Sequence, residues 1–123
     1  MHKLTSEQKR ARQAWSMARK GVAAHGTDYV NDAKGLPALI MNSGLMQVMA
    51  FLQGKGGRHA VLGQHLRDWL HQQCDTPPDF GPFMETLADM RDAREFQRVT
   101  TEALAWLKWL RQLAPAALPG KER

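Results

Sequence analysis

The sequence contains one cysteine, Cys74, among its 123 residues. A lone thiol excludes an internal disulfide, and a zinc site built around it would need several ligands of another kind. Long apolar runs are also missing. No segment approaches the roughly 18 consecutive apolar residues of a membrane-spanning helix, and the polar, basic start lacks the apolar stretch of a signal peptide. We therefore expect a cytoplasmic protein with no membrane partner.

The sequence also lacks the alternation of apolar and polar residues that is typical of β-strands. Its apolar fraction of 43% and charged fraction of 24% are ordinary for a globular protein of 123 residues, a length that can bury a core. Apolar residues instead recur at helical spacing along most of the chain. We predict an all-α fold, with residues 1–123 forming a compact single-domain bundle of about five to six helices.

Glycine, proline and capping residues divide this helical pattern into segments. The first helix is expected over residues 5–25, with Thr5 or Ser6 as its N-cap, followed by a short segment at 27–30. Residues 36–52 should form two helices or one bent helix, with Pro37 in a first turn. A loop is expected at 54–57, and a helix from there to about residue 72. After a loop at 75–82, we expect a short helix at 84–90 and a final helix from residue 96 that Pro115 ends.

Motifs for catalysis, metal binding and nucleotide hydrolysis are missing. The glycines at 54–57 lack both the earlier glycine and the following Ser/Thr of a phosphate-binding loop, and no nucleophile elbow occurs. His59, His65 and His71 lie six residues apart, so one helix face cannot bring them together. We interpret His65 as a histidine at the edge of the core. We predict that the chain is not an enzyme and has no catalytic residue, metal or cofactor.

The four tryptophans could pack in the core or stack on nucleic-acid bases. Trp15, Trp69 and Trp106 lie on apolar helix arcs, which favours packing in the core. Trp109 lies about 140° from Phe96 around the final helix, away from its apolar stripe. This position favours a contact with a neighbouring helix or with another subunit, so Trp109 is our candidate interface residue.

Basic charge is concentrated in the first half of the chain. The formal net charge is +5, but residues 1–67 contain ten Lys/Arg and three acids, a net charge of +7. On the first helix, four cations fall within about 100° of arc opposite the apolar stripe, and no acid occurs from residue 8 to 27. A face of one sign indicates a polyanionic partner. The candidate contacts are Lys9, Arg12, Arg19, Lys20, Lys34, Lys55, Arg58 and Arg67.

Three blocks of sequence, taken in order, resemble one protein family. They are Leu-Pro-Ala-Leu-Ile at 36–40 with the apolar run to residue 52, His-Leu-Arg-Asp-Trp-Leu at 65–70, and Thr-Glu-Ala-Leu-Ala-Trp-Leu-Lys-Trp-Leu at 101–110. Together with the basic first helix, they resemble the small helical subunit of type III-B CRISPR (Cmr) RNA-silencing effector complexes, over nearly the whole chain. The resemblance implies a compact, non-catalytic, all-helical subunit of an antiviral defence complex.

The same resemblance implies the partners. The chain is expected to stack along the filament beside other Cmr complex subunits and further copies of itself, and to contact guide RNA and target RNA through the basic face. A helical DNA-binding regulator is the first alternative, although the helix that begins near Arg58 is largely apolar and the first helix lacks a suitable partner helix for reading base edges. An adaptor that binds only protein is the second.

Overall fold

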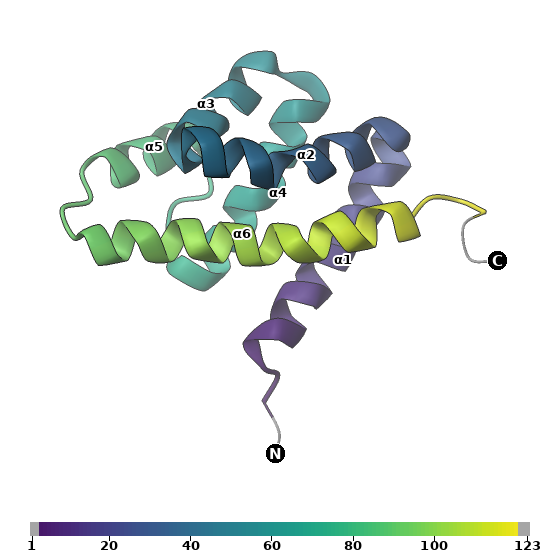
Figure 1. The fold of residues 1–123 in the computed structure, drawn as a ribbon, viewed down its shortest axis with the longest axis horizontal. Coiled ribbons are helices and arrows are strands. Elements are labelled where there is room, and N and C mark those ends of the chain that lie inside the picture. The colour runs from purple at the N-terminus through teal and green to yellow at the C-terminus, as the bar shows by residue number, and fades with distance from the viewer. Residues whose placement is uncertain (1–2, 121–123) are drawn as a thin grey trace.

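The computed structural model describes residues 3–120, which form six helices and no strand (Figure 1). The all-α class and the number of helices predicted from the sequence are confirmed. Buried apolar residues from all six helices form one hydrophobic core. The helices are α1 (Ser6–His25), α2 (Thr27–Ser43), α3 (Leu45–Lys55), α4 (Gly57–Cys74), α5 (Phe80–Ala88) and α6 (Ala93–Ala116).

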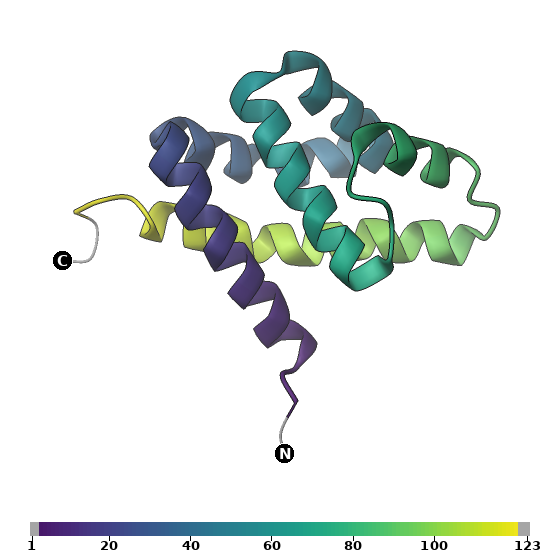
Figure 2. The same ribbon diagram turned by 180° about the vertical axis from the view of Figure 1, so that it is seen from behind.

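The longest helix, α6, runs along the length of the molecule and makes its most extensive contacts with α1 and α2 (Figure 1). α2 lies on the face turned toward the viewer in Figure 1, whereas α1 and α4 cross α6 on the opposite face, as Figure 2 shows. The first turns of α1 extend beyond α6 (Figure 2). This helix therefore presents one long side to solvent.

Single glycines join the first four helices. Gly26 separates α1 from α2, Gly44 separates α2 from α3, and Gly56 separates α3 from α4. Gly26 and Gly44 have φ angles of 57° and 86°, in a region where a side chain would strain the backbone. The chain can therefore change direction between helices within one residue, without a longer loop.

Some helix boundaries were predicted correctly and others were not. The first helix is confirmed, and the Thr5 hydroxyl caps it by accepting a hydrogen bond from the Gln8 backbone N–H at 3.1 Å. The break expected between residues 30 and 36 is wrong, because α2 continues through Pro37. Five buried residues at helical spacing hold α2 against the core, and this burial outweighs the hydrogen bond that proline cannot donate. They are Tyr29, Val30, Ala33, Leu36 and Ile40.

The expected loops are shorter than predicted. The loop at 54–57 is reduced to Gly56, because α3 runs through Gly54 to Lys55 and α4 begins at Gly57. The loop at 75–82 is reduced to residues 75–79, since Gly81 and Pro82 lie in the first turn of α5, where proline is tolerated. Pro115 lies within the last turn of α6 rather than after it.

Two of the three tryptophans predicted in the core are buried there. Trp69 and Trp106 have almost no exposed surface, whereas the side chain of Trp15 is 38% exposed. The prediction for Trp15 was wrong because it lies at the edge of the apolar arc of α1. The residues that this arc buries are small, including Ala14 and Ala18, and they leave no depth in which an indole at the edge could be covered.

Candidate nucleic-acid interface

Close packing of small residues determines how α1 is oriented. Gly21 is buried against the ring of Tyr29 on α2, and a Cβ at position 21 would overlap that ring. Tyr29 in turn forms a hydrogen bond with His65 on α4, with 2.8 Å between its hydroxyl and Nδ1. His65 was predicted at the edge of the core and is buried, with 8% of its surface exposed; this burial lowers the pKa of His65 to about 4.

A polar clamp holds the other side of α1 on α4 and α6. Arg10 donates two hydrogen bonds to Glu102, from Nε to Oε2 at 2.7 Å and from Nη2 to Oε1 at 2.9 Å. The Trp69 indole N–H donates to the same Oε2 at 3.0 Å. The Glu102 carboxylate raises the pKa of Arg10. Arg10 is thus a basic residue of α1 that is turned inward and is not available to a partner.

Two further indole N–H groups attach α1 to α6. Trp106 donates to Gln13 Oε1 at 2.6 Å, and Trp109 donates to Glu7 Oε1 at 3.2 Å. The Trp109 hydrogen bond, followed by that from Arg10, lowers the pKa of Glu7. Contact with a neighbouring helix was one of the two alternatives for Trp109. Its role as a subunit interface residue stays a prediction.

The clamp turns the opposite face of α1 toward solvent. Lys9, Arg12, Arg19 and Lys20 are all exposed on this face, and none of them forms an ion pair with another residue in the range 3–120. We call these four residues the cationic ridge. Their positive charge is therefore not neutralised within the described part of the chain.

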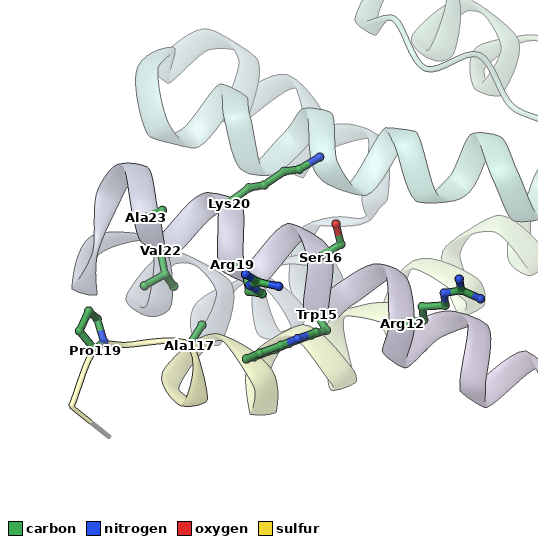
Figure 3. A pocket seen from close by; sticks show the side chains of 9 residues that line it. All are labelled: Arg12, Trp15, Ser16, Arg19, Lys20, Val22, Ala23, Ala117 and Pro119. Carbon is green, nitrogen blue, oxygen red and sulfur yellow. The ribbon is translucent and has the colours of Figure 1, made fainter. Parts of the chain in front are cut away.

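Two open grooves border the cationic ridge. The first, of about 670 Å³, lies between α1 and the end of α6 and is shown in Figure 3. The second, of about 500 Å³, lies between α1 and α4. Arg12 and Ser16 line both grooves, and no acidic residue or histidine lines either. The first groove is lined by Arg12, Trp15, Ser16, Arg19, Lys20, Val22, Ala23, Ala117 and Pro119, and the second by Leu4, Lys9, Arg12, Gln13, Ser16, Trp69, Gln72 and Gln73.

The remaining predicted cations do not join this surface. Lys34 and Lys55 are exposed on α2 and α3, and the Lys55 ammonium lies 5.9 Å from the centre of the Phe51 ring. Arg58 donates from Nε to Asp32 Oδ2 at 2.8 Å, and this carboxylate raises the pKa of Arg58. A phosphate would have to compete with Asp32 for that guanidinium.

Arg67 was wrongly included among the candidate polyanion contacts. Its side chain is only 2% exposed, and its Nε donates to the Pro78 carbonyl at 2.8 Å. The Arg67 guanidinium also lies over the Phe80 ring, 5.6 Å from its centre. Burial lowers the pKa of Arg67. This arginine holds the 75–79 segment against α4 and cannot reach an external phosphate.

Within residues 3–120, no three His, Cys, Asp or Glu side chains come together in a way that could hold a metal ion. None of the helices in this range is both long and apolar enough to cross a membrane. The cationic ridge and its two grooves are therefore the candidate site that we describe for this range.

Residues 6–117 match the model of the family described as CRISPR-associated protein (Cas_Cmr5). The chain belongs to this family. The Cas_Cmr5 match extends from the first residue of α1 to one residue beyond α6, so it includes both the cationic ridge and the clamp beneath it. The family resemblance inferred from the three sequence blocks and the basic first helix is confirmed.

Named relatives support this assignment. The chain is 32% identical over 95 residues to the CRISPR system Cmr subunit Cmr5 of Thermotoga maritima, covering 77% of this chain and 70% of the relative. It is 28% identical over 118 residues to the Cmr5 subunit of Thermus thermophilus, covering 93% and 96%. A crystal structure of a CRISPR-associated Cmr5 family protein from Thermus thermophilus matches with a TM-score of 0.79 at 26% identity, covering 94% of this chain and 98% of that one.

Sequence reasoning found the ridge of this Cmr5-family chain but missed the grooves. The positions of Lys9, Arg12, Arg19 and Lys20 follow from helical spacing alone. The second groove depends on where α4 crosses α1, and the first depends on the residues that follow α6. Trp15 carried a signal that could have revealed the first groove, because it falls between the apolar arc and the cations rather than in the middle of the arc.

Proposed function

We propose that this chain is a non-catalytic small subunit of a type III-B CRISPR (Cmr) effector complex, located in the cytoplasm, and that it contacts guide RNA and target RNA during antiviral silencing. The cationic ridge is the surface that makes this contact. One observation carries the proposal: α1 turns outward four cations that have no ion pair within residues 3–120, while the clamp with Glu102 withdraws Arg10 from the surface.

The dimensions of the ridge suit a phosphate backbone. Lys9 and Lys20 are eleven residues apart, which corresponds to about 16 Å along a helix axis. Cations over that length can meet several phosphates of one strand. In a guide-programmed complex, base pairing between guide and target supplies sequence specificity, so a supporting subunit needs only charge and shape complementary to the RNA.

The lining of the grooves supports a binding role rather than catalysis. General acid–base chemistry most often uses a histidine or a carboxylate next to the bound substrate. The side chains that line both grooves are instead basic, amide, hydroxyl, apolar or aromatic. Cleavage of RNA is therefore assigned to other subunits of the complex.

A separate apolar groove is proposed to bind a neighbouring protein subunit. It measures about 250 Å³ and is lined by Leu39, Ser43, Gln47, Val48 and Phe51 of α2 and α3. Leu39 and Phe51 are exposed although both are large and apolar. Copies stacked along a filament must use a head-to-tail contact between two different surfaces. The apolar groove is one of these surfaces, and the α1–α6 side near Trp109 is the other.

A charge-reversal experiment tests the RNA contact. Complexes assembled with Arg12→Glu/Arg19→Glu should bind target RNA more weakly, to the same extent for different sequences. The slope of log affinity against log salt should flatten by somewhat under one unit for each phosphate that the variant no longer neutralises. Arg91→Glu/Arg94→Glu changes the net charge equally at two exposed arginines that lie outside the ridge and were not predicted as contacts, so its slope should match that of the wild type.

Other outcomes lead to the alternative functions. If the ridge variant bound RNA as tightly as the wild type with an unchanged slope, the ridge would be reassigned to an acidic protein surface. Preferential binding of the free chain to duplex DNA would favour the helical DNA-binding regulator. Assembly without any RNA contact would favour the protein-only adaptor.

A further inference from the structure

Trp15 is unlike the other tryptophans in its surroundings. Its indole extends from α1 toward Ala117 along the first groove, with Arg19 beside it (Figure 3). The side chain is 38% exposed. An aromatic residue that remains exposed in a groove does not contribute its full hydrophobic area to folding. Core packing therefore does not account for a tryptophan at this position.

Trp15 also differs from the other three tryptophans in its hydrogen bonding. The indole N–H groups of Trp69, Trp106 and Trp109 each donate to a side chain of the protein. No hydrogen bond from Trp15 is found within residues 3–120. The N–H of this indole therefore has no partner in that range, and more than a third of the residue's surface is exposed to a ligand.

The chemistry of the groove restricts what that ligand can be. Arg12, Arg19 and Lys20 provide three cations on one side, while Val22, Ala117 and Pro119 provide an apolar wall. Cations next to an open aromatic face are the combination that binds single-stranded nucleic acid, in which phosphates follow the charges and a base stacks on the ring. Beyond the indole N–H and the basic groups, Ser16 is the one polar side chain in the lining, so an individual base is not read through many hydrogen bonds.

We propose that the first groove is a subsite for one unpaired nucleotide of RNA, whose base stacks on Trp15 while its flanking phosphates contact Arg12 and Arg19. This inference rests on the proposed function, because the ridge must first bring the RNA backbone to α1. The base must be unpaired, since the face of a base within a duplex is covered by its stacked neighbours. The subsite accepts any base, because every base has a face that can stack.

An abasic probe separates stacking from charge. The full chain is titrated at low salt with labelled oligouridine of about ten nucleotides, a length within the usual site size of single-strand binders. A second oligonucleotide of the same length has abasic riboses at every position, so it carries the same phosphates and no base that could stack. Trp15→Ala should weaken binding of oligouridine about fivefold or more and leave the abasic affinity unchanged. Trp15→Phe should retain most of the affinity for oligouridine.

Two controls accompany this titration. Phe51→Ala removes another exposed aromatic residue, one that lies outside the ridge, and should leave both affinities unchanged. In the wild type, oligouridine should quench tryptophan fluorescence more than the abasic oligonucleotide does, and Trp15→Phe should abolish this difference. The fluorescence readout holds even if the alanine variant folds poorly.

The failures of the two proposals are distinguishable. If Trp15→Ala weakened binding of both oligonucleotides equally, or of neither, while Arg12→Glu/Arg19→Glu still weakened both, the nucleotide subsite would be overturned and the phosphate-binding ridge would stand. If the wild type bound neither oligonucleotide and the assembled complex showed no dependence on the ridge, both proposals would be overturned. A Trp15→Ala variant that lost only an acidic protein partner would replace the RNA subsite with a peptide site.

Discussion

The cationic ridge of α1 and the apolar groove of α2 and α3 are both exposed, but they differ in chemistry and in what lies beneath them. The ridge carries cations without an ion pair in the described part of the chain, and α1 is held on its other side by hydrogen bonds from Arg10 and from the tryptophans at positions 106 and 109. The groove exposes Leu39 and Phe51, and the helices that form it are held mainly by apolar side chains.

The two regions show how a small helical protein can expose a charged surface and an apolar surface on differently supported helices. Apolar contacts tolerate rotation of a helix, because they have little directional preference. Hydrogen bonds with fixed donors and acceptors specify one rotation. Under the ridge, the directional contacts determine which side of α1 faces outward. The following predictions test whether the two regions depend on their supports in these different ways.

The largest effect is expected from removing the acceptor of the clamp. Glu102→Ala should lower the free energy of unfolding by about 3 kcal/mol, because a partly buried Arg10 and the Trp69 N–H both lose their partner. Urea unfolding measures this change. As a matched control, Asp32→Ala breaks the more exposed pair with Arg58 and should cost about 1 kcal/mol or less. Equal losses of unfolding free energy in the two variants would show that the hydrogen bonds to Glu102 stabilise α1 no more than a more exposed ion pair does.

A methyl group at position 21 should disturb the ridge from below. Gly21→Ala should lower the free energy of unfolding by about 2 kcal/mol, since the new Cβ would overlap the buried Tyr29 ring. Gly35→Ala makes the same change in α2, where the added Cβ has no neighbour within 4 Å, and should instead stabilise the helix by about 0.5–1 kcal/mol. Thermal unfolding of both variants checks the opposite signs. Stabilisation by both would mean that α1 can move away from Tyr29 at little cost.

The Tyr29–His65 contact joins α2 to α4 and should make stability depend on pH. Burial lowers the pKa of His65 to about 4, against an opposing effect of Asp68 and with smaller contributions from Lys20 and His25. The unfolded chain therefore binds the proton first as pH falls, so this stabilisation is complete above about pH 6.5 and is lost toward pH 4. Between pH 6.5 and 5 the loss should be about 1.5 kcal/mol.

The matched variant for this pH dependence is His65→Asn, which keeps a polar group close to Tyr29 but cannot take up a proton. Its unfolding free energy, measured by urea titration at each pH, should lack the part of the pH dependence that His65 provides. A variant with the same pH profile as the wild type would show that other groups cause the loss.

The smallest effect on stability is expected at the apolar groove. Leu39→Lys/Phe51→Lys should change the free energy of unfolding by no more than about 0.5 kcal/mol, because both side chains are already exposed. Native mass spectrometry of the reconstituted complex should nevertheless show fewer copies of this subunit per assembly, while the salt dependence of RNA binding stays the same. Normal copy number in this variant would remove the groove from the assembly surface.

Several features of the fold could be predicted because they depend on local spacing. The all-α class, the first helix with its Thr5 cap, and the positions of Trp69 and Trp106 follow from helical periodicity and capping chemistry. Helix boundaries were less predictable. Pro37 lies inside α2 because burial of five neighbouring residues outweighs the local preference of proline, and such burial is a property of the packed molecule.

The amino-acid sequence by itself determined the cationic ridge, since a face of one sign on one helix requires nothing beyond 3.6 residues per turn. Tertiary structure decided which cations of the chain are available to a partner. It buried Arg67 beneath the 75–79 segment, paired Arg58 with Asp32 and turned Arg10 toward Glu102. It also left Trp15 in a groove that exists only where α1 meets the end of α6. The physical reason is that periodicity specifies the direction of a side chain around its own helix, whereas exposure depends on which other helix occupies that direction.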